Sequence, residues 1–339
     1  MATKLLNFTN YDGLLFVGDP HVWSKGPGKR LDSEIFSSVV LGKIEQAVNI
    51  AIERNLYLVF LGDLFHVHTE NNITLLTKLI RILKKLPNPP VTVEGNHEKS
   101  QTKLSDDVAL SMLREAGVIY TIEKSDFWGH FVFKDKSEAY IGSTPYGEKI
   151  PTEIKKQSEN STHIWLTHHD LDFGNSYPGV IPLKEIKGVD ILVNGHIHQT
   201  KKPIVVGNMK AHNPGNITRL SIDCKDHIPA VWQWKKEQDQ DLEPIDLIFE
   251  KHIFDLSGKQ IEIDEIKPVM AEEYTVQQTS QFVEKMNEHA KEYDPKKTDD
   301  GAYLKDNIQA LGKVMQLDGK FLEEILGLVD ETLENENKK

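Results

Sequence analysis

The chain has 339 residues, of which 39% are apolar and 27% are charged, and its formal net charge is −12. This composition is typical of a globular protein, and the single cysteine, Cys224, excludes an internal disulfide bond and fits a reducing compartment. No apolar run approaches the roughly 20 residues that a membrane-spanning helix needs, and the N-terminus shows no signal-peptide pattern. We therefore expect a cytoplasmic protein without a membrane partner.

The negative charge is confined to the C-terminal third of the chain. Residues 1–234 hold 26 basic and 26 acidic residues, whereas residues 235–339 hold 14 basic and 26 acidic ones. The acidic balance therefore does not exclude a phosphate-rich partner such as DNA for the larger, neutral part of the chain.

The N-terminal region predicts a strand, a helix and a second strand. Residues 14–17 form an apolar run that is followed by Asp19 and His21. A helix is expected from residue 32 or 33 to about residue 55, because apolar residues recur there at helical spacing. The next apolar run ends at Gly62-Asp63. This order is typical of two parallel neighbouring strands.

The alternation of helix and strand then continues, and the next strand again ends in a group of polar residues. A helix is expected over residues 73–85, which the prolines of residues 87–90 terminate. A third strand, residues 91–94, leads into Gly95-Asn96-His97-Glu98, and a third helix is expected over residues 105–116.

The following segments predict mostly strands. Residues 164–167 lead to His168-His169, and residues 190–193 lead to Gly195-His196-Ile197-His198. Of the two adjacent histidines, we favour His168 for a site, because it comes first after the apolar run. The other segments with strand character are 118–122, 127–133, 139–142, 203–206, 219–223 and 231–234.

Beyond about residue 238, after a few strand-like segments, the sequence becomes strongly polar and helical in pattern. We expect one domain over residues 1–235, a small β-rich cap over residues 236–275 and an acidic helical region over residues 276–339 that binds a partner. An apolar stripe in the last region is either ordinary packing or a face for a partner helix.

Seven polar side chains each follow the end of a predicted strand, and we expect them to meet at one sheet edge. Asp63 is placed to bridge two ions, and the mixture of carboxylate, amide and imidazole ligands suits manganese, iron or zinc. The expected cofactor is thus a pair of divalent ions, with manganese as first choice. The seven residues are Asp19, His21, Asp63, Asn96, His168, His196 and His198.

The five blocks D-x-H, G-D, G-N-H, a lone His and G-H-x-H resemble the calcineurin-like metallophosphoesterases in order and spacing. The resemblance implies an α/β fold of two packed β-sheets flanked by helices. It implies that one metal is held by Asp19, His21, Asp63 and His198, and the other by Asp63, Asn96, His168 and His196. It also implies that His97 contacts the scissile phosphate and assists the leaving oxygen.

Within that superfamily, Gly62-Asp63-Leu64-Phe65-His66 resembles the second block of SbcD-type DNA repair nucleases. This likeness implies that His66 helps to place the phosphate. It implies an exonuclease or endonuclease of DNA repair or recombination, which acts by two-metal hydroxide attack on the phosphodiester. The implied partners are DNA and an SbcC-type SMC-like ATPase subunit, and a homodimer is also compatible.

Some positions depart from the family pattern. Val22-Trp23 stand where the family usually has Leu-Gly, Glu98 replaces the commoner aspartate, and Asn216 replaces a serine. Two alternatives therefore stay open. One is a metallophosphoesterase that acts on cyclic nucleotides or phosphoproteins, and the other is a non-enzymatic scaffold with an inactive site.

Overall fold

The computed structural model describes residues 5–26, 33–99, 104–174, 181–220 and 227–247. The chain divides into two units, residues 1–267 and 268–339, and all described residues lie in the first. The predicted cap over residues 236–275 therefore lies mostly outside the described residues, and the predicted helical region over residues 276–339 lies outside them entirely.

One sheet has six strands in the order β13-β12-β2-β3-β4-β5. The strands β2 to β5 pair in parallel, whereas β12 runs antiparallel to both β2 and β13. Their bounds are β2 Gly13–Val17, β3 Leu56–Phe60, β4 Val91–Val93, β5 Tyr120–Ile122, β12 Ala230–Trp234 and β13 Glu243–Asp246.

The other sheet has seven strands in the order β1-β6-β7-β8-β9-β11-β10. The strands β7, β8 and β9 are parallel to one another, and β11 is parallel to β9. Their bounds are β1 Leu6–Thr9, β6 Asp126–Val132, β7 Glu138–Thr144, β8 Thr162–Thr167, β9 Ile191–Asn194, β10 Lys201–Val206 and β11 Met209–Asn213.

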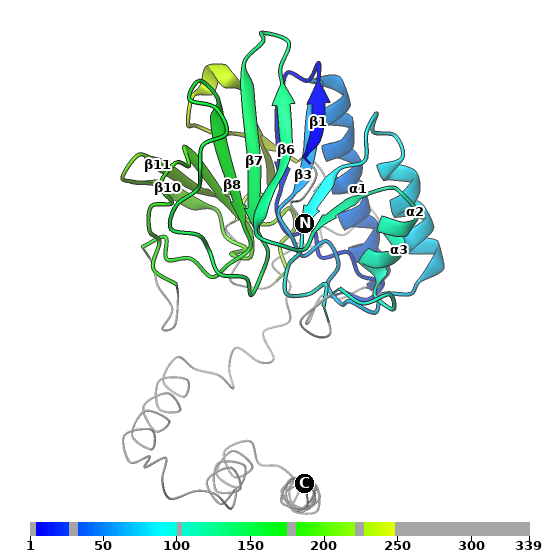
Figure 1. Cartoon of the computed structure of the whole chain (residues 1–339). Helices are drawn as coiled ribbons and strands as arrows, with labels where there is room; N and C mark the ends of the chain where they lie inside the picture. Colours follow the sequence, from blue (N-terminus) through cyan, green and yellow to red (C-terminus); the bar gives the residue numbers. More distant parts are fainter. Residues whose placement is uncertain (1–4, 27–32, 100–103, 175–180, 221–226, 248–339) are drawn as a thin grey trace, which may run out of the picture. The chain divides into compact units, whose positions relative to one another are not determined.

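Alternating side chains of β2 and β3 build two separate cores. Leu15 and Phe60 face the first core, which the helices complete, whereas Phe16 and Val59 face the second core between the two sheets. Figure 1 shows the three helices together on one side of the molecule. Their bounds are α1 Ser33–Glu53, α2 Ile73–Leu83 and α3 Ala109–Glu115, and a 3-10 turn spans Lys236–Gln238.

The predicted α/β architecture of two packed sheets flanked by helices is confirmed, with local corrections. The third helix begins at Ala109 rather than at residue 105, because the Ser105 hydroxyl donates to Asp107 and closes a turn there. The strands β1 and β11 were not predicted. Arg219 and Leu220, at the start of a predicted strand, are not in a strand, and residues 221–223 lie outside the described part.

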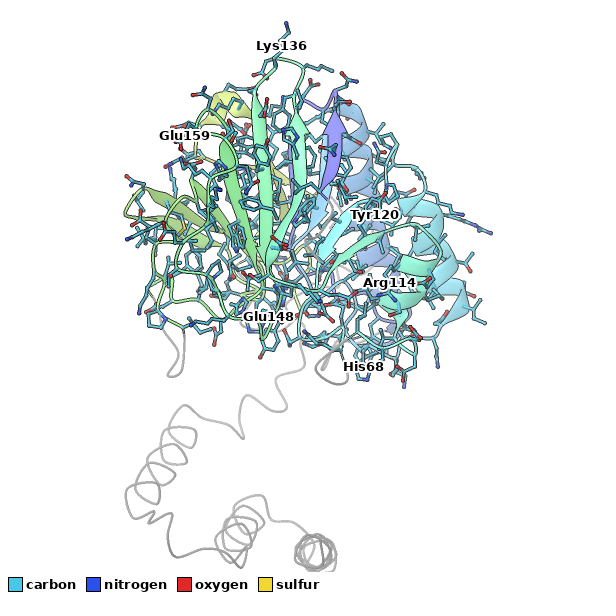
Figure 2. The ribbon with its side chains drawn as sticks, in the orientation of Figure 1. His68, Arg114, Tyr120, Lys136, Glu148 and Glu159 are labelled. Atoms are coloured by element: carbon cyan, nitrogen blue, oxygen red, sulfur yellow. The ribbon has the colours of Figure 1, made fainter. Side chains whose placement is uncertain are left out.

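This topology sets one edge of the molecule apart. The parallel strands β2, β3 and β4 of one sheet and β8 and β9 of the other end there. Figure 2 shows Glu148, which follows β7, and His68, which follows β3, at this edge, opposite Lys136 and Glu159. Among the described residues, no helix combines the length and the apolar character needed to cross a membrane.

Candidate metal centre

The chain turns sharply where the strands end at this edge. Asp19, His21, Asp63 and His196 all have positive φ angles, of 27°, 50°, 45° and 72°. Such values are uncommon for residues other than glycine, and they cost free energy that the surrounding structure must offset. Four of the seven predicted ligands thus lie on strained turns, which is typical of functional sites.

Two glycines leave the space that the site needs. Gly62 has a φ of 118°, and a Cβ there would overlap the His168 ring. A Cβ at Gly95 would overlap the Asp63 carboxylate. The G-D and G-N-H blocks therefore need glycine because side chains of the site pass directly over the backbone.

A first group of donors contains Asp19, His21 and His198. Their donor atoms lie within 4.8 Å of one another, and the Nε2 atoms of His21 and His198 are 3.0 Å apart. Both carboxylate oxygens of Asp19 and the Nδ1 atom of His21 are buried without a hydrogen-bond partner in the described part of the chain. Buried polar atoms without partners are costly, and a cation in this group would satisfy them.

A second group contains Asp63, His168 and His196, whose donor atoms also lie within 4.8 Å of one another. The Nε2 atom of His168 is 3.2 Å from the Asp63 Oδ2 atom. The Asn96 Oδ1 atom lies 3.2 Å from His168 Nε2 and 3.0 Å from His196 Nδ1. The same Asp63 oxygen is 3.8 Å from His21 Nε2, so Asp63 lies between the two groups.

The structure thus brings all seven predicted residues together, and their role as ligands stays a prediction. Each group mixes the two sheets, because His168, His196 and His198 follow β8 and β9 whereas the other four follow β2, β3 and β4. The donors are oxygen and nitrogen atoms only, and this set fits a pair of divalent ions of the manganese, iron or zinc type.

Burial and neighbouring charges shift the pKa values of several groups in the site. Burial raises the pKa of Asp19 to about 7, an effect that the Asp63 charge adds to and His168 opposes. Burial also acts to raise the pKa of Asp63, but the neighbouring His168 and His21 hold it well below its usual range. Burial would lower the pKa of His168, but the Asp63 charge raises it to about 10. Without metal, Asp63 and His168 therefore form a buried ion pair.

Hydrogen bonds to backbone carbonyls orient several of the histidines. The Nδ1 atom of His168 donates to the Leu61 carbonyl at 2.8 Å, which leaves Nε2 to face the second group. His97 Nδ1 donates to the His66 carbonyl at 2.5 Å. His169 instead donates from Nε2 to the Glu148 carbonyl at 2.9 Å. His168 and not His169 therefore faces the site.

His66 and His97 lie beside the first group. A ring nitrogen of each comes within 4.8 Å of His21 and of the other, and the two ring centroids are 5.2 Å apart. The backbone N–H of His97 donates to Asp63 Oδ1 at 3.0 Å. Burial and the neighbouring His97 lower the pKa of His66, which favours a neutral ring at neutral pH.

Glu98 had no predicted role, and the structure shows one. Its buried carboxylate accepts hydrogen bonds from the backbone N–H groups of Asp63 at 3.1 Å, Phe65 at 3.2 Å and Gly95 at 2.8 Å. Burial and then the Asp63 charge raise the pKa of Glu98 to about 8, against the opposite effect of His168 and these N–H groups. Glu98 therefore ties together the two loops that present Asp63 and Asn96.

Several basic residues follow the G-N-H and G-H-x-H blocks in sequence and are candidates for contact with a phosphate, among them Lys99, Lys103, Lys201 and Lys202. The Lys99 ammonium pairs with Glu94 at 3.1 Å and donates to the Tyr146 carbonyl at 3.0 Å, so it is engaged in the fold. Lys201 donates to Gln199 at 3.2 Å, and Lys202 is exposed. Lys103 and residues 27–30 lie outside the described part. Tyr146, which was not predicted, lies near the site with its ring centroid 5.6 Å from that of His196.

Comparison with known proteins places this geometry in context. Residues 14–200 match the family model described as calcineurin-like phosphoesterase. A search of curated proteins found no match.

Three solved structures are among those that a search with this structure matched. The 5'-nucleotidase precursor from Thermus thermophilus has 12% identity and a TM-score of 0.39, and the match covers 69% of this chain and 54% of that one. The NAD nucleotidase of Haemophilus influenzae has 10% identity and a TM-score of 0.37, with 69% and 48% covered. A hypothetical protein from Thermus thermophilus has 9% identity and a TM-score of 0.42, with 68% and 97% covered. The chain therefore spans about half the length of the first two, and none of these similarities bears on the substrate.

Proposed function

The chain belongs to the calcineurin-like phosphoesterase family, and from this premise we propose that it is a metal-dependent DNA phosphodiesterase, the nuclease subunit of an SbcCD-like complex. The family membership implies a metal-dependent hydrolase of phosphoesters. One observation supports the finer assignment to DNA. The SbcD-like segment from Gly62 to His66 places the His66 ring 5.2 Å from that of His97, beside the first donor group.

The two donor groups would hold the ions. Asp19, His21 and His198 would bind one ion, Asn96, His168 and His196 the other, and Asp63 would bind both. Two bound divalent ions would lower the pKa of an attacking water and offset charge on the phosphate oxygens.

His97 and His66 provide the remaining chemistry of the site. Since His97 Nδ1 donates to a carbonyl, its Nε2 is the atom left to contact the phosphate, and in the doubly protonated imidazolium form it would give the Nε2 proton to the departing oxygen. His66 would contact a non-bridging oxygen and so hold the phosphate in line for attack. Both roles come from the SbcD likeness and fit the positions of the rings.

The charge distribution is compatible with DNA and with a protein partner. Residues 1–234, which include every residue of the two donor groups, have equal numbers of basic and acidic residues, so this region does not repel a polyanion. The acidic residues 276–339 are proposed to bind the SMC-like ATPase, with DNA bound at the metal centre.

Cleavage of linear duplex DNA in the presence of Mn²⁺ tests this function. The wild-type chain is expected to cleave, whereas Asp63→Ala and His97→Ala are expected to lose at least about a hundredfold in rate. His68→Ala serves as the matched control, because His68 is a nearby histidine outside both donor groups, and it is expected to retain activity.

A second comparison separates DNA from other phosphoesters. The same preparation is offered duplex DNA, a cyclic nucleotide and a phosphopeptide, and the DNA is expected to be turned over fastest. Full DNA cleavage by Asp63→Ala or His97→Ala would contradict the proposal. Preference for the cyclic nucleotide or the phosphopeptide would replace it with the alternative phosphoesterase activity.

A further inference from the structure

The loops that follow β2 and β3 run side by side at the metal centre. His21 N–H donates to the Asp63 carbonyl at 2.9 Å, Val22 N–H to the Leu64 carbonyl at 2.7 Å, and His66 N–H to the Val22 carbonyl at 3.1 Å. Val22 and Phe65 form an isolated parallel bridge. These bonds fix the register of the two loops, and they place Trp23 next to His66.

The side chains of Trp23 and His66 are in face contact. Their ring centroids are 4.6 Å apart and their planes are inclined by 31°. The His66 ring also lies 5.2 Å from the His97 ring, with an inclination of 34°. The His66 ring therefore contacts both Trp23 and His97, and the His21 ring meets both histidines edge-on.

His66 differs from His97 and His168 in what holds its ring. Hydrogen bonds to carbonyls orient His97, His168 and His169. The Nδ1 atom of His66 is buried and has no hydrogen-bond partner among the described residues. Contact with Trp23, His97 and His21 is thus what limits the rotation of its ring.

Trp23 is itself held firmly enough to act as a support. It is half-buried, and its indole packs against the core that the helices and the first sheet share. An aromatic ring anchored in this way loses little further freedom when a second ring rests on it.

We infer that Trp23 is a positioning residue, whose indole face fixes the plane of the His66 imidazole and so aims its Nε2 atom at a phosphate oxygen. The inference rests on the proposed function in one respect, that His66 contacts the phosphate. It does not require that the phosphate belong to DNA. A small phosphodiester therefore tests it separately from the DNA assignment.

A double-mutant cycle on hydrolysis of bis(4-nitrophenyl) phosphate with Mn²⁺ measures the coupling of Trp23 and His66. Loss of the support is expected to lower kcat about tenfold or more in Trp23→Ala, within the range for residues that orient a site. In the His66→Ala background the same substitution is expected to change kcat less than about twofold. Trp23→Phe retains a ring face and is expected to keep most of the activity.

A control variant separates positioning from packing. Ile80 is another partly buried side chain that packs on the same core without touching the site. Ile80→Ala is expected to lower the unfolding temperature, as Trp23→Ala does, while leaving kcat unchanged.

A second measurement needs no metal and no substrate. In the metal-free protein, the ring protons of His66 are expected to have NMR shifts displaced upfield by the indole, assigned through their loss in His66→Ala. Trp23→Phe is expected to keep part of that displacement, and Trp23→Leu to abolish it.

Each outcome decides between support and contradiction. A tenfold loss in Trp23→Ala that persists in the His66→Ala background would overturn the inference, as would unchanged His66 shifts in Trp23→Leu. Coupled loss on the small diester combined with no cleavage of DNA would support the positioning role and reject the DNA assignment.

Discussion

At the scale of single residues, Glu98 is the best example of a side chain that acts through its neighbours. Its two oxygens accept three backbone N–H groups from the loops that carry Asp63 and Asn96. Above about pH 8, where the Glu98 carboxyl is ionised, Glu98→Gln would make one of these N–H groups face an amide NH₂ and lose its acceptor. An unsatisfied buried donor costs about 1–3 kcal/mol, so the free energy of unfolding in urea is expected to fall by this amount. The phosphoesterase rate is expected to fall about 10- to 100-fold.

The control for this variant is an exposed glutamate with a single partner. Glu115 pairs with Arg114 at 3.1 Å and its side chain is 75% exposed, so Glu115→Gln is expected to change neither quantity measurably. Glu98→Gln with wild-type stability and rate would show that the loops hold their shape without the carboxylate.

The sequence predicted the donors of the site better than their supports. Asp19, His21 and the others could be found because the type and spacing of metal-binding residues are visible along the chain. The contacts of Glu98 and Trp23 depend on the register of loops that are far apart in sequence. Only the folded structure brings Trp23 beside His66, so no local pattern could predict that contact.

At the scale of elements, the end of β3 is where a small change has the largest expected effect. Gly62→Ala would impose a side chain at a φ of 118° and against the His168 ring. Strain at such a backbone position costs about 1–3 kcal/mol, and displacement of His168 is expected to weaken metal binding about tenfold or more. Thermal unfolding and titration with Mn²⁺ measure the two effects.

Gly117 provides a matched control for the backbone term. It has a φ of 67°, and a Cβ there would meet nothing within 4 Å. Gly117→Ala is therefore expected to lower stability by about 1 kcal/mol and to leave metal binding unchanged. Equal effects of both variants on metal binding would rule out the overlap with His168 as the cause.

The elements with the strongest sequence patterns were predicted best. The strands β3, β8 and β9 are buried apolar runs that end in polar residues, and they were predicted close to their observed positions. The strand β11, Met209–Asn213, contains lysine, histidine and asparagine between small and apolar residues, so its composition carried no strand signal. It forms because β9 and β10 pair with it on either side, which is a long-range effect.

At the scale of the whole molecule, protons and metal ions compete for the same side chains of the site. The pKa of His168 is raised to about 10 and that of Asp19 to about 7, whereas metal ligands must be deprotonated. Between about pH 7 and 10, metal binding therefore releases one proton, from His168. Below about pH 7 it releases two, because Asp19 is then protonated as well. The apparent affinity is expected to rise with pH, about tenfold per unit for each proton released.

Calorimetric titration with Mn²⁺ at about pH 6, 7 and 8.5, in buffers with different ionisation enthalpies, measures this release directly. The number of protons released is expected to decrease from about two toward one as the pH rises. An affinity that does not depend on pH would show that these groups do not bind the ion.

Each donor group draws its residues from both sheets, so the groups form only as the two sheets come together during folding. The group around Asp19 takes His198 from the other sheet, and the group around Asp63 takes His168 and His196 from it. An ion bound in either group would thus link the two sheets. A chain emerging from the ribosome lacks the full set of donors until residue 198 has been synthesised and both layers have closed, so the two groups can bind a pair of ions only once the layers are assembled.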